Sequence, residues 1–359
     1  MKGDLPQNKR PYSPDNIKET KLKRKNRSEF KLNNKRNICK VSTLKKKIIC
    51  IFLLIAIIFI IFSNIKIINT EINNDKINDF FKYKIPIAYS ANNKYIFPTL
   101  VSMISLLENI KYENTFYDIY VLISNNFTRD NINILKSVQK KYPKKCRVYI
   151  INMGNMYIDQ KVFSPAHFYR LSLHEKLSYI NKIIYLDGDT LIFDDLTEMI
   201  NLDMKDNYVL GFLDSDVRIM QKYGLKNAVV VCSGVLLMDL KALRRNNATE
   251  KFRAFMKMQN NTAPDQNVIN YALYGHIGAL PPKYGMWGFT ECSHAIIHNN
   301  VQMAWIKYNT QDVKNAFYHP SIIHFTSGKP FYSKNSVYFT EWWNYAKKSG
   351  YSRIMPVPE

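Results

Sequence analysis

Two carboxylates, Asp187 and Asp189, stand one residue apart directly after a short apolar run, and no other spacing in the chain suggests chemistry as strongly. The run, residues 183–186, is rich in β-branched and aromatic side chains, as in a buried parallel strand, and a second apolar run at 191–193 follows. Burying two anions between hydrophobic segments is costly unless their charge is compensated. A divalent cation that prefers oxygen ligands, Mg²⁺ or Mn²⁺, would compensate it. Gly188 between the carboxylates leaves room for a bound partner to approach the backbone.

A single Asp-x-Asp triplet is weak evidence, because a solvated acidic turn after a strand has the same pattern. The chain contains a second such triplet at residues 214–216. The two flanking apolar runs strengthen the case for a metal–diphosphate site. This interpretation of Asp187 and Asp189 and that of an acidic turn are then about equally supported.

The segments around this triplet alternate between strand-like and helix-like patterns. The predicted strands lie at residues 85–90, 117–123 and 147–151, and the predicted helices at 97–110, 131–141 and 166–180. Such alternation indicates an α/β fold of right-handed βαβ units, with a parallel sheet covered by helices on both faces. Ligands of such sheets bind beyond the carboxyl ends of the strands, where residues 92–95 and 187–189 are expected.

The second half of the chain continues the pattern less regularly. We predict strands at 208–213 and 229–240, the latter interrupted at residues 232–234, and a basic helix at 242–258. A further helix begins at residues 264–267, where free backbone amides favour carboxylates or phosphates.

The formal net charge of +22 is concentrated at the N-terminus, where residues 1–47 contain 16 Lys/Arg and 4 Asp/Glu. This segment has no hydrophobic periodicity and is predicted to be disordered. The uncharged apolar run that follows, residues 48–65, would span roughly 27 Å as a helix, enough for a thin bilayer. The position of the basic tail beside a membrane-spanning run explains its charge more simply than nucleic-acid binding does. None of the five cysteines has C-x-x-C spacing, so no zinc site is indicated.

Residues 48–65 are interpreted as a transmembrane signal anchor. The absence of charge argues against a buried core helix, and the 47-residue leader argues against a cleavable signal peptide. The basic side of an anchor stays cytoplasmic. The chain is therefore predicted to be a single-pass type II protein of the Golgi or endoplasmic reticulum, with a cytoplasmic tail (1–47), a stem (66–84) and a lumenal domain (85–359). Three N-x-[ST] triplets, at Asn126, Asn247 and Asn260, are compatible with this orientation.

From Ile85 to Phe331 the order of motifs resembles the family 8 glycosyltransferases. The chain contains an apolar strand with a polar loop and tyrosine (85–95), an arginine before the metal strand (Arg170), and the strand end Leu186-Asp-Gly-Asp189. A small-residue segment (232–236), an Asp-Gln pair (265–266) and a His…Gly-Lys-Pro motif (324–331) follow in the family's order. The resemblance implies a GT-A (Rossmann-like) mixed sheet flanked by helices. It also implies a retaining hexosyltransferase that uses a UDP-sugar, with UDP-galactose or UDP-glucose as the expected donor.

The resemblance also implies roles for individual residues. The implied ligands of Mn²⁺ or Mg²⁺ are Asp187, Asp189 and His324. The residues expected to bind the nucleotide-sugar are Ala91, Asn92, Tyr95, Arg170, Asp187, Gly188, Asp189, Ser233, Gly234, Gly328 and Lys329. The candidates for contact with the transferred sugar or the acceptor are Gln266, Asp265 and Asp214. The acceptor, whether glycan, lipid or protein, stays open.

The chain shows four departures from the family pattern, and the first three of them support an alternative. Asn92 replaces an aspartate, Cys232 an asparagine and Asn267 an aspartate, and the C-terminal motif is one residue shorter and ends in Phe331. A catalytically degenerate member that binds UDP or sugar, or acts as a scaffold, would show such changes.

Overall fold

The computed structural model describes residues 83–214, 218–225, 228–287, 308–354 and 357–358, which fall in one compact unit, residues 81–359. The predicted tail and anchor, and all but the end of the stem, lie outside the described residues. Residues 215–217, with two members of the second Asp-x-Asp triplet, lie outside them as well. Within the described ranges, no helix combines the length and apolar character needed to cross a bilayer.

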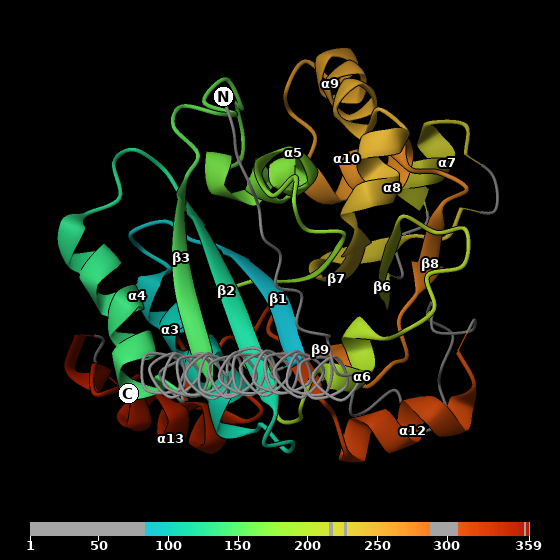
Figure 1. Cartoon of the computed structure of the whole chain (residues 1–359). Helices are drawn as coiled ribbons and strands as arrows, with labels where there is room; N and C mark the ends of the chain where they lie inside the picture. The colour runs from blue at the N-terminus through green and yellow to red at the C-terminus, as the bar shows by residue number, and fades with distance from the viewer. Residues whose placement is uncertain (1–82, 215–217, 226–227, 288–307, 355–356, 359) are drawn as a thin grey trace, which may run out of the picture. The chain divides into compact units, whose positions relative to one another are not determined.

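A seven-stranded sheet forms the centre of this unit, in the order β3-β2-β1-β4-β7-β6-β8 (Figure 1). Its strands are β1 (Tyr83–Ser90), β2 (Thr115–Ile123), β3 (Cys146–Asn152), β4 (Lys182–Leu186), β6 (Val209–Leu213), β7 (Val231–Asp239) and β8 (Ile277–Ala279). The pairs β1–β2, β2–β3, β1–β4 and β6–β8 are parallel, as the βαβ pattern predicts. β7 runs antiparallel to both β4 and β6, so the sheet is mixed.

A three-stranded sheet connects distant parts of the chain beside the end of β4. β5 (Thr190–Ile192) pairs antiparallel with β10 (Ile322–His324), which pairs parallel with β9 (Tyr284–Trp287). His324 is the partner of Thr190 in this register. The small sheet therefore brings the C-terminal motif next to the Asp-x-Asp turn.

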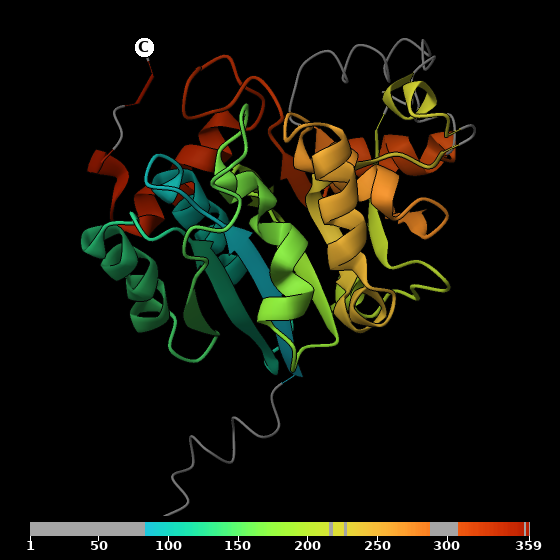
Figure 2. The same cartoon turned by 90° about the horizontal axis from the view of Figure 1, so that it is seen from above.

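Helices cover both faces of the large sheet (Figure 2). One face packs against α3 (Ile96–Glu108), α4 (Arg129–Lys141) and α13 (Phe339–Ser349); the other packs against η1 (Pro165–Ser172), α5 (Leu173–Lys176), α8 (Leu240–Arg245), α9 (Ala248–Met258) and α10 (Asp265–Ala272). Alternate strand residues enter the two cores: Ile87 and Tyr89 lie in the first, and Ala88 lies in the second. The remaining described helices are α6 (Thr197–Ile200), α7 (Arg218–Lys222), α12 (Thr310–Tyr318) and η3 (Ser352–Ile354).

Three predicted elements differ from the observed ones. The segment 166–180 is a 3₁₀ helix and one α-helical turn instead of an amphipathic helix, because residues 168–174 are all buried and leave no solvent face. The helix predicted at 242–258 breaks into α8 and α9 at Asn247, which adopts the left-handed conformation that asparagine tolerates. Strand β7 continues through residues 232–234, and the predicted interruption is confined to its pairing with β6, which shifts register from Gly211–Leu236 to Leu213–Val231.

Candidate active site

A pocket of about 570 Å³ lies beyond the carboxyl ends of β1 and β4 and along the first half of β7. Six of the predicted site residues up to the Asp-x-Asp turn line it: Asn92, Tyr95, Arg170, Asp187, Gly188 and Asp189. Six more line it from the second half: Ser233, Gly234, Asp265, Gln266, His324 and Lys329. The fold therefore brings most of the predicted set to one place.

Main-chain pairing holds the two carboxylates and the histidine together. The amide of Asp187 donates to the carbonyl of Gly234 at 2.7 Å, which fixes the end of β4 against β7. The amide of Phe325, directly after His324, donates to the carbonyl of Asp189 at 3.0 Å. Both ends of the Asp-x-Asp turn are therefore fixed by strands from other parts of the chain.

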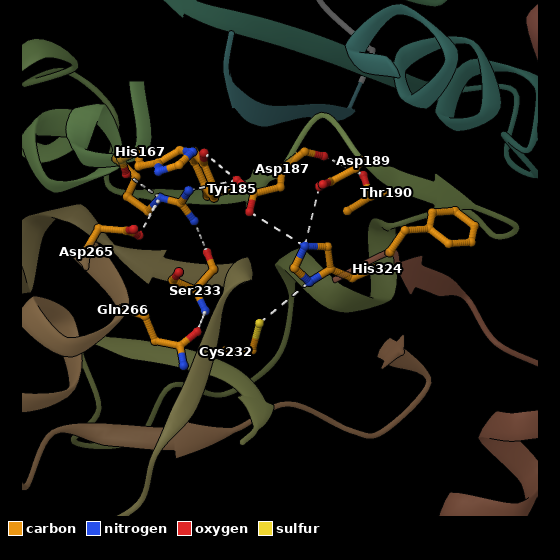
Figure 3. A network of polar contacts seen from close by, with 12 residues as sticks. His167, Tyr185, Asp187, Asp189, Thr190, Cys232, Ser233, Asp265, Gln266 and His324 are labelled. Carbon is orange, nitrogen blue, oxygen red and sulfur yellow. Dashed lines mark hydrogen bonds and ion pairs between the residues drawn. The ribbon is translucent and has the colours of Figure 1, made fainter. Parts of the chain in front are cut away.

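The side chains of Asp187, Asp189 and His324 converge (Figure 3). Nε2 of His324 lies 3.6 Å from Oδ2 of Asp187 and 3.5 Å from Oδ1 of Asp189. One ligand atom from each residue lies within 4.8 Å of the others. Neighbouring ligands of a cation bound at about 2.1 Å lie about 3 Å apart, so the separation suits a shared ion. Two carboxylate oxygens and one imidazole nitrogen match the chemistry of Mn²⁺ or Mg²⁺, and the nitrogen favours Mn²⁺.

Lys329 and His324 supply positive charge to the buried Asp189. The ammonium of Lys329 pairs with Oδ2 of Asp189. Burial opposes ionisation of Asp189, but His324 and Lys329 outweigh it and lower the pKa of this carboxyl. Burial likewise opposes the charge of His324, yet Cys232 and Asp189 raise its pKa to about 10. A bound cation would take over this charge compensation, because its histidine ligand must be neutral.

Arg170, predicted to bind the nucleotide-sugar, is engaged by the protein itself. Its buried guanidinium lies 2.8 Å from Oδ1 of Asp187 and 3.1 Å from Oδ2 of Asp265, and donates to the carbonyl of Ser233. The guanidinium also lies over the ring of Tyr185, 4.3 Å from its centroid. Burial opposes its charge, but the two aspartates outweigh this and raise the pKa of Arg170. The structure places Arg170 where it orients Asp187 and joins β4, β7 and α10.

Replacing Arg170 by methionine is expected to destabilise the protein by about 3–5 kcal/mol, because the change leaves two carboxylates without their buried partner. Urea unfolding measures the difference. The matched control is Arg253→Met, which removes an exposed arginine paired with Glu250 and should cost less than about 1 kcal/mol. Equal effects of the two changes would contradict the structural role of Arg170.

The start of α10 presents Asp265 and Gln266 to the pocket. Gln266 is held at both ends of its amide: Oε1 accepts from the amide of Ser233 at 3.2 Å, and Nε2 donates to Oδ2 of Asp214 at 2.8 Å. Burial raises the pKa of Asp265, and the nearby Arg170 counteracts it. Asp214 does not line the pocket and reaches it through Gln266.

Asn92 and Tyr95 occupy the opposite end of the pocket, after β1. The side-chain oxygen of Asn92 accepts from the backbone amides of Lys94 and Tyr95, each at 3.0 Å, and so closes the turn that starts α3. The ring centroid of Tyr95 lies 5.9 Å from the ammonium of Lys329. An aromatic face, an amide and a cation therefore share this end.

Besides Asp214, two predicted residues lie outside the pocket lining. Ala91 is buried beneath it, and Gly328 is exposed with φ of +56°. Nine lining residues were absent from the predicted set, among them His167, Tyr185 and Cys232. Tyr185 stands two residues before Asp187 and donates to its Oδ1 at 2.9 Å, so strand periodicity could have found it.

The model of Glycosyl transferase family 8 matches residues 86–334, and the chain belongs to this family. The chain is 26% identical over 215 residues to lipopolysaccharide 1,2-glucosyltransferase of Escherichia coli, which covers 55% of this chain and 61% of the relative. It is 22% identical over 263 residues to general stress protein A of Bacillus subtilis, 70% of this chain and 89% of the relative. It is also 24% identical over 225 residues to a probable galacturonosyltransferase-like protein of Arabidopsis thaliana, covering 57% of this chain and 59% of the relative. The chain spans about three fifths of the length of the first two curated relatives it matches.

The fold is that of solved glycosyltransferases. The galactosyltransferase LgtC, in complex with donor and acceptor sugar analogs, superposes with a TM-score of 0.61 at 18% identity, over 74% of this chain and 95% of that one. An active-site mutant of LgtC gives a TM-score of 0.64 at the same identity, over 74% of this chain and 96% of that one. This likeness confirms the predicted α/β architecture around a mixed sheet.

Proposed function

We propose that this protein is a metal-dependent retaining glycosyltransferase that moves a hexose, galactose or glucose, from a UDP-sugar to a glycan, lipid or protein acceptor. The observation that carries the proposal is the convergence of Asp187, Asp189 and His324 at the carboxyl end of β4, inside a pocket large enough for a nucleotide-sugar. Membership of family 8 supports it, as do relatives that transfer sugars.

The three residues would hold Mn²⁺ or Mg²⁺, which would stabilise negative charge on the departing diphosphate. Lys329, which is partly buried and paired with Asp189, would contribute a point charge to that diphosphate. With Tyr95 and Asn92 at one end and Asp265 and Gln266 at the other, the nucleoside would lie toward β1 and the sugar toward α10.

The retaining outcome would depend on the sugar end of the pocket. Asp265 is paired with Arg170, so it is unsuited to attack the sugar. Gln266, held between Asp214 and β7, would lie beside the reacting carbon and orient the sugar. Departure of UDP on the face from which the acceptor approaches agrees with this arrangement.

A donor screen tests the proposal. The full chain is incubated with UDP-glucose, UDP-galactose and other UDP-sugars, with and without Mn²⁺, and UDP release is measured. Metal-dependent release from a UDP-hexose is the expected result. Tight binding of UDP without turnover on any acceptor panel would instead support the degenerate, ligand-binding alternative that Asn92, Cys232 and Asn267 suggest.

We further propose that residues 48–65 anchor the protein with its glycosyltransferase domain in the lumen of the Golgi or endoplasmic reticulum. The apolar run and its basic flank support this orientation. The side chains of Asn126, Asn247 and Asn260 are exposed, as acceptors of N-linked glycans must be.

In eukaryotic cells the full chain should therefore resist alkaline extraction from membranes. It should also migrate faster on a denaturing gel after endoglycosidase removes its glycans. Deleting residues 48–65 should abolish both properties. A full chain that is extracted as a peripheral protein and carries no glycan would contradict the anchor.

A further inference from the structure

Cys232 lies against the imidazole of His324 on the side away from the carboxylates. Its sulfur is 3.6 Å from Nδ1 of His324, whereas Nε2 faces Asp187 and Asp189 (Figure 3). Both side chains are buried, and both line the pocket. The ring therefore stands between a thiol and the pair of carboxylates.

Strand β7 supplies this arrangement. Cys232 and Gly234 both face the imidazole of His324, although the pairing of β7 with β6 shifts register in this part of the strand. A Cβ on Gly234 would lie 2.1 Å from Cε1 of His324, which shows that the ring rests directly over this glycine. Gly234 provides the space for the ring, and Cys232 provides a polar partner next to that space.

The chemistry of a metal-bound histidine requires such a partner. A cation bound to Nε2 occupies the lone pair of that nitrogen, so the proton of the neutral ring must reside on Nδ1. In metal sites this N–H is usually donated to an acceptor, which fixes the tautomer and the ring orientation. In the described part of the chain, the hydrogen-bond partner observed at Nδ1 is the sulfur of Cys232.

We infer that Cys232 is a positioning residue for the metal site: its sulfur accepts the Nδ1 proton of His324 and keeps Nε2 directed at the cation. The inference rests on the metal site of the proposed function. It assigns a use to the cysteine that stands where relatives are expected to have asparagine. It also predicts that the affinity for the metal depends on a side chain that does not touch the ion.

Calorimetric titration of the full chain with MnCl₂ alone tests this. Cys232→Val keeps a similar volume without an acceptor, and it should weaken Mn²⁺ binding about tenfold to a hundredfold, as loss of such partners does. Cys232→Ser keeps an acceptor and should restore part of the affinity. Wild-type affinity in Cys232→Val, or equal losses in both variants, would overturn the inference.

The matched control is Cys146→Val, since Cys146 is the other free cysteine in the described ranges and is buried outside the pocket. This change should leave Mn²⁺ affinity unaltered. A second measurement is nitrogen NMR of the histidine rings with Mg²⁺ bound. His324 of the wild type should carry its proton on Nδ1, and Cys232→Val should lose this single tautomer. The same tautomer in both proteins would count against the role of the sulfur.

These results separate the inference from the proposed function. Mn²⁺ binding that depends on Cys232, without UDP-sugar turnover, would support the inference and count against the transferase activity. Mn²⁺ binding that is indifferent to Cys232 would overturn the inference alone. A wild-type protein that binds no Mn²⁺ would overturn both.

Discussion

Asp187→Asn is expected to abolish Mn²⁺-dependent release of UDP from a UDP-hexose, with a loss of at least about a hundredfold. The amide keeps an oxygen that can accept from Arg170 and Tyr185, which bond Oδ1 of Asp187 in the wild type. It removes the charge that faces His324 across 3.6 Å. The change therefore tests the cation site with little disturbance of the buried arginine. Calorimetry should show a matching loss of Mn²⁺ affinity.

Asp194→Asn is the control for this experiment. Asp194 is a partly exposed carboxylate outside the pocket and pairs with Lys111 at 2.7 Å. Its replacement should change neither turnover nor Mn²⁺ affinity. Wild-type turnover in the Asp187 variant would remove the basis for a metal-dependent enzyme.

Gly234→Ala should have the next largest effect, although it alters no charged or polar side chain. The added Cβ would lie 2.1 Å from Cε1 and 2.5 Å from Nε2 of His324. The carbonyl of Gly234 accepts from the amide of Asp187 at 2.7 Å and holds this part of β7 against the end of β4, so we expect the imidazole to move instead. The ring is buried, and overpacking of this kind costs about 1–3 kcal/mol. We expect Mn²⁺ affinity to fall at least about tenfold, since the displaced ring is a ligand.

Gly278→Ala separates this effect from general crowding. Gly278 lies in β8, away from the pocket, and its added Cβ would lie 2.6 Å from Cδ2 of Leu210. This variant should melt at a lower temperature while it keeps wild-type Mn²⁺ affinity. If the two alanine variants lose stability alike and both retain wild-type Mn²⁺ affinity, the position of the His324 ring as a metal ligand does not depend on the space above Gly234.

The first half of the site could be predicted from the sequence because it depends on local patterns. The apolar run before Asp187 and the strand that leads to Asn92 are both observed as β4 and β1. Parallel strands end at one edge of the sheet, so residues after them were expected to meet. The pocket lining confirms that Asn92, Tyr95, Asp187 and Asp189 do.

The approach of His324 had no local signal and was expected only from the family resemblance. It depends on β5 and β10, strands of three residues each, which pair across a long stretch of sequence. Such short segments carry too few residues for periodicity to identify them. The position of Arg170 was equally hidden, since the 3₁₀ helix that carries it is buried from Phe168 to Ser172 and lacks the amphipathic pattern that the prediction used.

Anomalous diffraction at the manganese edge, from crystals of the protein grown with Mn²⁺ and UDP, would locate the cation in the pocket. We expect one strong peak within bonding distance of Asp187, Asp189 and Nε2 of His324, next to the diphosphate. A nucleotide bound in the pocket with no manganese at these three residues would contradict it.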